Sequence, residues 1–267
     1  MSFSNRQSAP IATPRLAPLA RLLIAALLLS AGPARAQATL KPDGQWRHLL
    51  TAGLNLNSGN TRSESLTLDS DSVRAREHDK WSANAQVFHS RNAGNTTAER
   101  ARLTTQYNGD LSTQVFAFVQ GAGLVDRPAN IGRRLSASTG LGLHLMKRDR
   151  EFWDAWAGLS LARQRYVRAT LVDGQLRQGF NDAGLVLAQE SSLRLSQSTS
   201  WKQKLVLLPS ARDSKRMRSD FDTQLTVAIS ERLNLSTGLS LRHTSHPAPG
   251  LKRLDAAFVT GLSLRID

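Results

Sequence analysis

Apolar and polar residues alternate along most of this chain, and the pattern is clearest at its C-terminus. Between Leu254 and Ile266 the even-numbered residues are mostly apolar and the odd-numbered ones mostly small or polar, with no turn residue between them. A period of two is typical of a β-strand whose two faces meet different surroundings. The run is long enough to cross a bilayer, which needs about 9–11 tilted residues. Pairing it with the first alternating run, 46–57, would close a barrel, as a sheet in lipid requires.

The same pattern predicts twelve strands and an all-β fold. The predicted strands span residues 46–57, 63–75, 80–91, 98–108, 112–125, 134–146, 152–165, 179–195, 200–209, 217–229, 233–244 and 252–266. An even number is typical of bacterial transmembrane barrels. We therefore expect one antiparallel transmembrane β-barrel, over residues 37–267, closed by pairing of the first and last strands. In 63–75 and 112–125 the alternation is too weak to decide which face points outward.

The lengths of the connections and the positions of the tryptophans both predict how the barrel is oriented in the membrane. Every second connection is a short turn, whereas the others, such as 91–97 and 167–178, are longer or richer in Gly and Pro. Short periplasmic turns are typical of outer-membrane barrels, so both termini are predicted in the periplasm. Four tryptophans stand at the starts of odd-numbered strands, on the apolar row, and indole rings collect at membrane interfaces. They predict an interface girdle of Trp46, Trp81, Trp153 and Trp201.

Residues 1–36 have the three parts of a secretory signal peptide. Arginines precede a short apolar core at 22–29, and Ala34-Arg35-Ala36 is a small-residue cleavage motif. Cleavage would leave 31 of the 35 Lys and Arg against 21 Asp and Glu, a net charge of +10, and no cysteine. The predicted location is the cell outer membrane after signal-peptide cleavage.

Strand parity places a set of charged side chains inside the barrel. The predicted lumen charges are Glu190, Arg194, Lys202, Lys204, Arg218, Asp220, Asp222, Arg242 and Arg265. They could form a pore wall that selects ions, or a ladder of ion pairs that fills a narrow barrel. Basic residues dominate near the periplasmic end, so an open lumen is expected to prefer anions mildly.

A second basic cluster is predicted at the outer rim, where lipopolysaccharide phosphates are natural counter-charges. It consists of Arg133, Arg134, Arg163, Arg165, Arg168, Arg212, Lys215 and Arg216. A merely solvated rim is the alternative. Nucleic acid is not expected as a partner despite a pI near 11.3, because the strands are patterned and a secretory signal precedes them.

No catalytic, cofactor or metal motif is found in the sequence. The histidines are scattered, and His144, which parity places in the lumen, is expected to be hydrogen-bonded rather than a general base. We therefore expect no enzyme activity, no cofactor and no metal.

The segment Gly53–Thr61, the Ser/Thr/Asp-rich run after it, the Trp-led third strand and the late Asp255 resemble a known family. This is the bacterial family of salt-induced outer-membrane proteins, defined largely as a domain of unknown function. The resemblance implies an outer-membrane barrel and a link to salt stress, but no established activity. Barrels of this kind usually end in an aromatic residue that helps the barrel assembly machinery. This chain ends Arg265-Ile266-Asp267, so either assembly is less efficient or the signal tolerates Ile.

These observations predict a monomeric outer-membrane protein of the bacterial envelope, structural or forming a narrow pore, with membrane lipids and lipopolysaccharide as partners. Two other functions stay open. An outer-membrane lipid-modifying enzyme would need a Ser/His pair within hydrogen-bond reach. A secreted soluble β-protein would carry polar residues on the row that faces outward.

Overall fold

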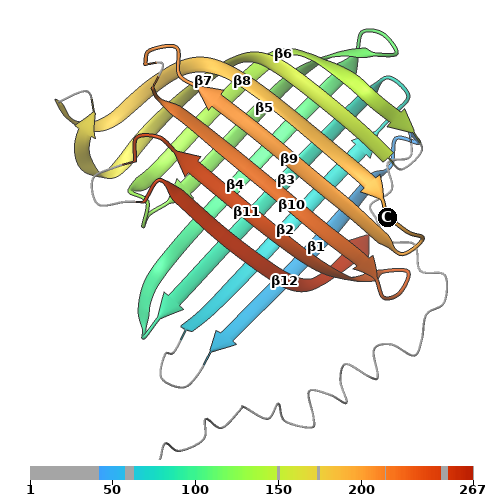
Figure 1. Cartoon of the computed structure of the whole chain (residues 1–267), viewed down its shortest axis with the longest axis horizontal. Helices are drawn as coiled ribbons and strands as arrows, with labels where there is room; N and C mark the ends of the chain where they lie inside the picture. The colour runs from blue at the N-terminus through green and yellow to red at the C-terminus, as the bar shows by residue number, and fades with distance from the viewer. Residues whose placement is uncertain are drawn as a thin grey trace, which may run out of the picture. The chain divides into compact units, whose positions relative to one another are not determined.

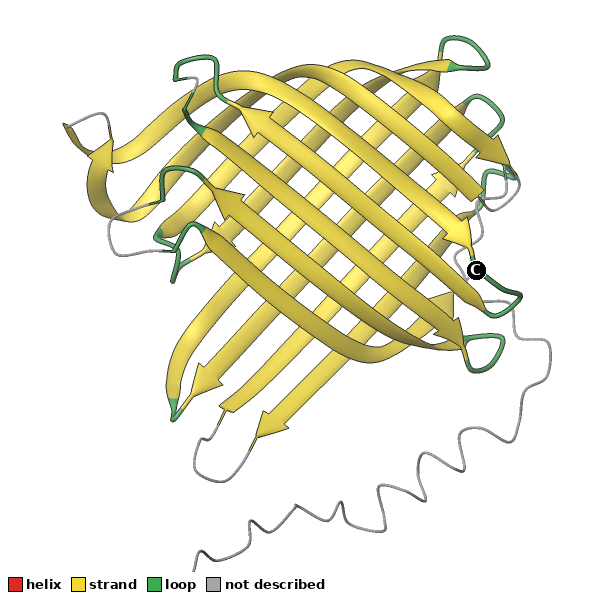
Figure 2. Cartoon of the chain, in the orientation of Figure 1, coloured by secondary structure: helices red, strands yellow, loops and turns green. Residues whose placement is uncertain are grey.

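The computed structural model describes residues 42–57, 63–148, 151–172, 175–213, 215–247 and 252–266. The predicted signal peptide, 1–36, and the end of the Gly53–Thr61 motif lie outside these ranges. The described residues form one closed antiparallel barrel in which each strand pairs with its neighbours in sequence (Figures 1 and 2). Its twelve strands are β1 (Trp46–Asn57), β2 (Ser63–Ala75), β3 (Asp79–Asn92), β4 (Asn95–Asp110), β5 (Val115–Asp126), β6 (Ile131–Arg148), β7 (Glu151–Val172), β8 (Gln175–Arg194), β9 (Thr199–Pro209), β10 (Met217–Ala228), β11 (Leu233–Thr244) and β12 (Leu254–Ile266). The predicted fold class is confirmed.

Several strands run further than the sequence predicts, at the end of the barrel away from the termini. Ala93 and Gly94 both have positive φ, 49° and 82°, so a two-residue turn joins β3 directly to β4. In β7 and β8, Thr170–Val172 pairs with Gln175–Arg177. The expected long loops at 91–97 and 167–178 are therefore wrong, because most of these residues continue the strands as hairpins.

The first and last strands close the barrel, as predicted. Their pairing runs from His48 opposite Ile266 to Ala52 opposite Leu262. Beyond it the two strands separate in Figure 1, and the register between them extends no further among their described residues. A chain of buried hydroxyl groups reinforces the closed part, with Ser263 Oγ 2.7 Å from Thr51 Oγ1 and 2.6 Å from Ser236 Oγ.

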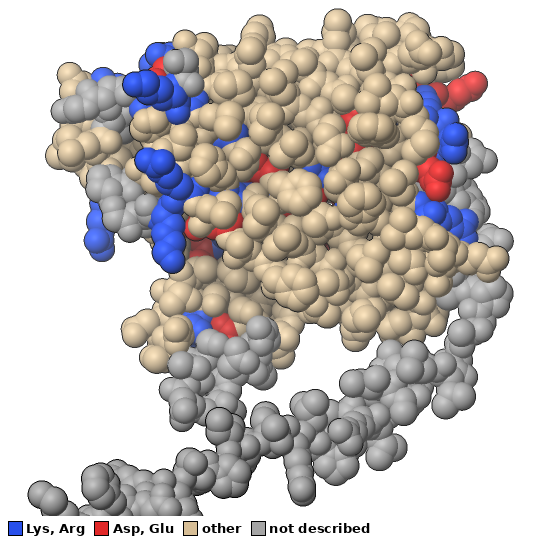
Figure 3. Space-filling model, viewed as in Figure 1, with Lys and Arg blue, Asp and Glu red and all other residues tan. Residues whose placement is uncertain are grey.

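The barrel wall has apolar side chains outside and polar ones inside. On β6, Leu141 and Leu143 are 57% and 51% exposed, whereas Ser138 on the opposite face of the same strand is buried. On the face that Figure 3 shows, the wall is mostly uncharged and the largest groups of charged residues lie at the two ends. Soluble proteins place these groups the other way round. Within the described residues there is no helix with the length and hydropathy that a membrane crossing needs.

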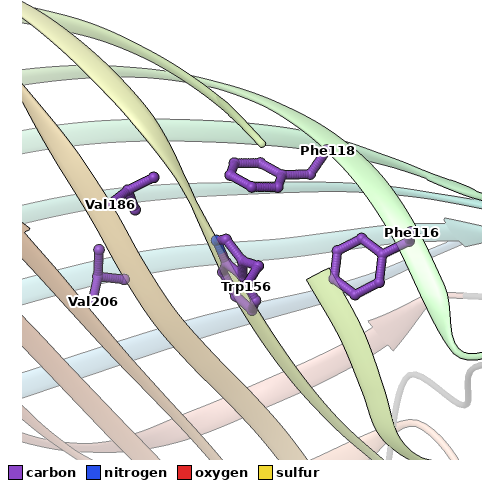
Figure 4. Packing of buried hydrophobic residues seen from close by; sticks show 5 residues of the cluster. All are labelled: Phe116, Phe118, Trp156, Val186 and Val206. Carbon is purple, nitrogen blue, oxygen red and sulfur yellow. The ribbon is translucent and has the colours of Figure 1, made fainter. Parts of the chain in front are cut away.

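The structure decides the two strands whose faces the sequence left open. On β2, Leu66 and Leu68 point outward, while Thr67 is buried in the lumen. On β5, Phe116 and Phe118 are fully buried inside the barrel and pack with Trp156, Val186 and Val206 (Figure 4).

Gly142 provides the space for the Phe116 ring. A Cβ atom at this position would overlap Phe116, so the aromatic ring covers the backbone of β6 where a side chain is missing. The lumen glycine at 142 therefore seats an aromatic side chain and does not widen the pore.

Candidate functional site

The lumen is the candidate functional site. We call the end where β1 begins and β12 ends the terminal end, and the opposite end the distal end. A cavity of about 320 Å³ occupies the lumen and is lined by residues from all twelve strands. Among its described lining residues, seven are acidic and seven basic, so the wall carries no formal net charge. The acidic ones are Asp69, Asp71, Asp126, Glu190, Asp220, Asp222 and Asp255, and the basic ones are Arg100, Arg102, Arg134, Lys202, Lys204, Arg218 and Arg242.

At the terminal end, a hydrogen-bonded layer narrows the lumen around Asp154. The Asp154 carboxylate, 3% exposed, lies 2.7 Å from His144 Nδ1 and accepts a hydrogen bond from Lys80 Nζ at 3.1 Å. His144 Nε2 also lies 3.1 Å from Asp110 Oδ1, and its ring is 4.7 Å from that of Phe116. Since β3, which carries Lys80, is not a neighbour of β7, the Lys80–Asp154 pair crosses the lumen.

The middle of the lumen holds a group centred on Glu190. Its carboxylate lies 3.4 Å from Lys202 Nζ and 3.3 Å from Lys204 Nζ. Lys202 also donates to Asp71 on β2 at 2.7 Å, which is a second bond across the lumen. Lys204 lies over the Trp156 ring, 5.3 Å from its centroid. Each lysine here therefore has a negative or aromatic partner.

The distal half of the lumen is rich in arginine. Arg100 donates to Asp126 at 2.6 Å, and Arg242 donates to Asp222 at 2.9 Å. Arg102 and Asp220 form a pair at 3.1 Å that joins β4 to β10 across the lumen. Arg100–Asp126 and Arg242–Asp222 join neighbouring strands, so among these three pairs only Arg102–Asp220 links strands that are far apart in the wall.

Seven of the nine predicted lumen charges line the cavity, and two do not. Arg194 lies at the terminal end, where its guanidinium donates to the carbonyl oxygens of Ser196 and Gln197 in the turn. Arg265 is on the inner row of β12, opposite Leu49, beyond the cavity lining. For Lys202 and Lys204 the expectation of uncompensated positive charge is wrong, because Glu190 and Asp71 pair with them.

The sequence did not identify half of the cavity's charged residues. Asp69 and Asp71 were missed because β2 alternates poorly. Arg100 and Arg102 lie on β4, whose inward row, read by parity from Gln106 and Asn108, could have revealed them. Arg134 was assigned to the outer rim, but it lines the cavity and its Nε donates to Gln164 Oε1 at 2.6 Å.

The four predicted girdle tryptophans all lie at the terminal end. Trp46, Trp81 and Trp153 are between 40% and 47% exposed, and Trp201 is partly exposed with its Nε1 donating to Thr223 Oγ1 at 2.7 Å. Tyr107 belongs to the same ring of aromatic residues. It is 42% exposed and packs edge-to-face on Trp81 with a centroid distance of 5.9 Å.

One serine–histidine pair bears on the enzyme alternative. His48 Nδ1 lies 2.8 Å from Ser72 Oγ, on the outer face of β1 and β2. His48 stacks on Trp46, and no carboxylate or amide orients its ring within the described residues. No described group of three or more His, Asp or Glu is arranged to hold a metal ion.

Before β1, an ion pair ties the chain to the barrel. Asp43 accepts a hydrogen bond from Arg47 Nη1 at 3.0 Å and another from the Gln45 amide at 3.0 Å. The hydrogen bond from Arg47 is the main reason why the pKa of the Asp43 carboxyl falls to about 2. Asp43 therefore stays ionised through the physiological range, next to a buried arginine.

Comparison with known proteins gives a family and a set of similar barrels. The family described as "Protein of unknown function, DUF481" matches residues 50–265. The NanC porin is 12% identical, with a TM-score of 0.47, over 82% of this chain and 100% of that one. The translocator domain of autotransporter NalP from Neisseria meningitidis is 12% identical, with a TM-score of 0.42, over 84% and 91%. The KdgM porin is 6% identical, with a TM-score of 0.40, over 84% and 100%. No curated protein matches the chain significantly.

Proposed function

The chain belongs to the DUF481 family, and from this premise and its lumen we propose that it is an outer-membrane β-barrel that forms a narrow pore. In this proposal the termini lie in the periplasm, and the barrel has no catalytic chemistry of its own. Small ions and polar solutes enter the cavity from the distal end. They pass the terminal end only when the layer around Asp154 and Phe116 moves.

The observation that carries the proposal is the distribution of side chains across a closed wall. Exposed leucines form the outer rows, and acidic and basic residues line the cavity. Closure of a barrel pairs the backbone groups of neighbouring strands, which a sheet in lipid requires. A secreted soluble protein would need polar side chains at positions such as Leu141 and Leu159, which are 57% and 65% exposed.

The ion pairs across the lumen support a link to salt. Lys80–Asp154, Lys202–Asp71 and Arg102–Asp220 join opposite walls at 2.7 to 3.1 Å. Dissolved ions that enter the cavity compete for these charges, and the screening length falls from about 8 Å at physiological ionic strength to about 3 Å at 1 M salt. Salt would therefore loosen the bonds that hold the lumen closed.

The distal rim supports contact with lipopolysaccharide. Its exposed basic residues are Arg133, Arg163, Arg165, Arg168, Arg212 and Lys215, and Lys and Arg gather at this end in Figure 3. Guanidinium groups bind phosphate with paired hydrogen bonds. Arg134, which the sequence assigned to this cluster, lines the cavity and is not part of the rim.

Cell fractionation and bilayer recordings test the proposed function. We expect the protein in the outer-membrane fraction, with different gel mobility in boiled and unboiled samples. In a planar bilayer we expect a small conductance that rises more steeply with salt than the conductivity of the solution, because salt weakens the cross-lumen pairs. Recovery as a soluble periplasmic protein would contradict the membrane assignment, and an inserted barrel without conductance would leave a structural role.

The His48–Ser72 pair supports a second candidate, an enzyme that hydrolyses lipids at the outer face of the wall. Here His48 would take the proton of the Ser72 hydroxyl as Ser72 Oγ attacks the ester carbonyl, and would pass that proton to the leaving alcohol; water would then hydrolyse the acyl-serine and release the fatty acid. Refolded protein mixed with phospholipid vesicles should then release fatty acid, and Ser72→Ala should abolish the release. Equal release by the two proteins, or none by either, would remove this candidate.

A further inference from the structure

Five arginines line the distal half of the cavity, and the four aspartates that pair with them contact only three of the five. We call them the distal arginine group; they are Arg100, Arg102, Arg134, Arg218 and Arg242, from β4, β6, β10 and β11. Arg100, Arg102 and Arg242 each have an aspartate within 3.1 Å. Among the residues that the structure describes, Arg134 and Arg218 have no aspartate at such a distance.

Arg134 and Arg218 have no carboxylate at ion-pair distance within the described residues. Arg134 donates to the neutral amide oxygen of Gln164, with its Nε at 2.6 Å. Arg218 lines the cavity and makes no hydrogen bond and no ion pair within 4 Å in the described part of the chain; the acids that act on it from further away are Asp220 and Asp182. The carboxylate of Asp182, on the neighbouring wall, accepts from Ser210 at 2.6 Å and does not line the cavity.

The two arginines also lie near one another and share Asp220 as an acidic neighbour, while Asp182 acts on Arg218 and Asp126 on Arg134 from beyond ion-pair distance. They are close enough for the charge of Arg218 to act on Arg134. Asp220 is the nearest shared acid, and it already faces Arg102 at 3.1 Å and Arg242 at 3.7 Å. All four arginines, including Arg134 and Arg218, act electrostatically on Asp220. Asp220 is therefore shared, and its short contacts go to Arg102 and Arg242 and not to Arg134 or Arg218.

Two guanidinium groups without a carboxylate at ion-pair distance, in a narrow polar cavity, are well suited to an anion. Burying a charge without a partner is costly, because it loses water and gains no ion pair. A guanidinium presents N–H donors in a planar fork that matches carboxylate and phosphate oxygens. Ser136, Ser138 and Gln120 line the same cavity and add neutral hydrogen-bonding groups for the rest of a hydrophilic solute.

We propose that Arg134 and Arg218 form a binding site for a small hydrophilic oxyanion, with the chemistry shared by carboxylate and phosphate. A cavity of about 320 Å³ has room for such an ion with part of its water shell, since one water takes about 30 Å³ in the liquid. The inference takes the lumen of the proposed pore as the path of this solute, and it names the class of solute that the lumen selects.

Calorimetric titration of the whole barrel, refolded in detergent, tests this site without any need for conductance. Inorganic phosphate and acetate are titrated separately, each against chloride at equal ionic strength, and the better of the two shows which oxyanion the site prefers. We expect binding in excess of chloride. Arg218→Gln should weaken it about tenfold, equivalent to about 1.4 kcal/mol. Arg134→Gln should do the same and serves if the first variant fails to fold, as judged by gel mobility before and after boiling.

Arg133→Gln is the matched control, because Arg133 precedes Arg134 on the same strand but is exposed on the outer face. The Arg133→Gln variant should bind the oxyanion as tightly as the unchanged protein does. If neither oxyanion binds better than chloride, water alone hydrates these arginines and the proposal is overturned. Equal losses in Arg133→Gln and Arg218→Gln would also overturn it, since binding would then be at the rim. Oxyanion binding without conductance would support the site and count against the pore.

Discussion

Asp154→Asn is expected to lower the free energy of unfolding by about 3–5 kcal/mol, the usual cost of removing one partner of a buried ion pair. Asn keeps the size of the side chain but removes the charge that faces Lys80 at 3.1 Å and His144 at 2.7 Å. Lys80 would then lie 19% exposed, without its counter-charge. The measurement is urea unfolding of the barrel in phospholipid vesicles, followed by tryptophan fluorescence.

A second substitution separates the lost ion pair from other effects. Lys80→Met in the Asp154→Asn background should recover part of the stability, because the unpaired charge is then absent. Glu64→Gln is the control, since its pair with Arg91 at 3.8 Å is about half exposed on both sides and should be worth about 0–1 kcal/mol. A loss in Asp154→Asn no larger than that in Glu64→Gln would show that the Asp154 layer does not hold the lumen together.

Leu141→Arg is expected to lower the free energy of unfolding of the barrel in a bilayer by about 2–4 kcal/mol. This is the cost of a basic residue on the lipid face near the midplane of a barrel. Leu141 is 57% exposed on the outer wall. It lies five positions from Met146, the residue opposite girdle residue Trp153. A charge there has no water and no partner within reach. The same unfolding measurement in vesicles reports the change.

Ser138→Arg is the comparison on the same strand. Ser138 lines the cavity and bonds to Ser160 Oγ at 3.0 Å. An arginine at this position reaches a hydrated space with carboxylates, so its effect should be clearly smaller. If Ser138→Arg proved the more damaging of the two, the outer face of β6 would not be in contact with lipid.

The alternation of apolar and polar residues was enough to determine the fold. Side-chain direction in a strand depends only on parity, so a run such as 233–244 specifies its length and both its faces without reference to other strands. The pairing of Trp46–Asn57 with Leu254–Ile266 followed from one further physical rule, that a sheet in lipid can leave no edge unpaired. The sequence missed hairpins such as the one at Ala93-Gly94, because there the strand is prolonged by its partner and not by its own pattern.

What the lumen does was decided by the tertiary structure. Parity placed Lys202 and Glu190 inside, but it carries no information on which residues meet across a barrel. The Lys202–Asp71 pair joins residues 131 positions apart, and it turned an expected excess of positive charge into a neutral wall. The same folding left Arg134 and Arg218 without carboxylates at ion-pair distance and packed Phe116 over Gly142. Contacts across a lumen depend on strand register and on the curvature of the wall, and both are set by all twelve strands together.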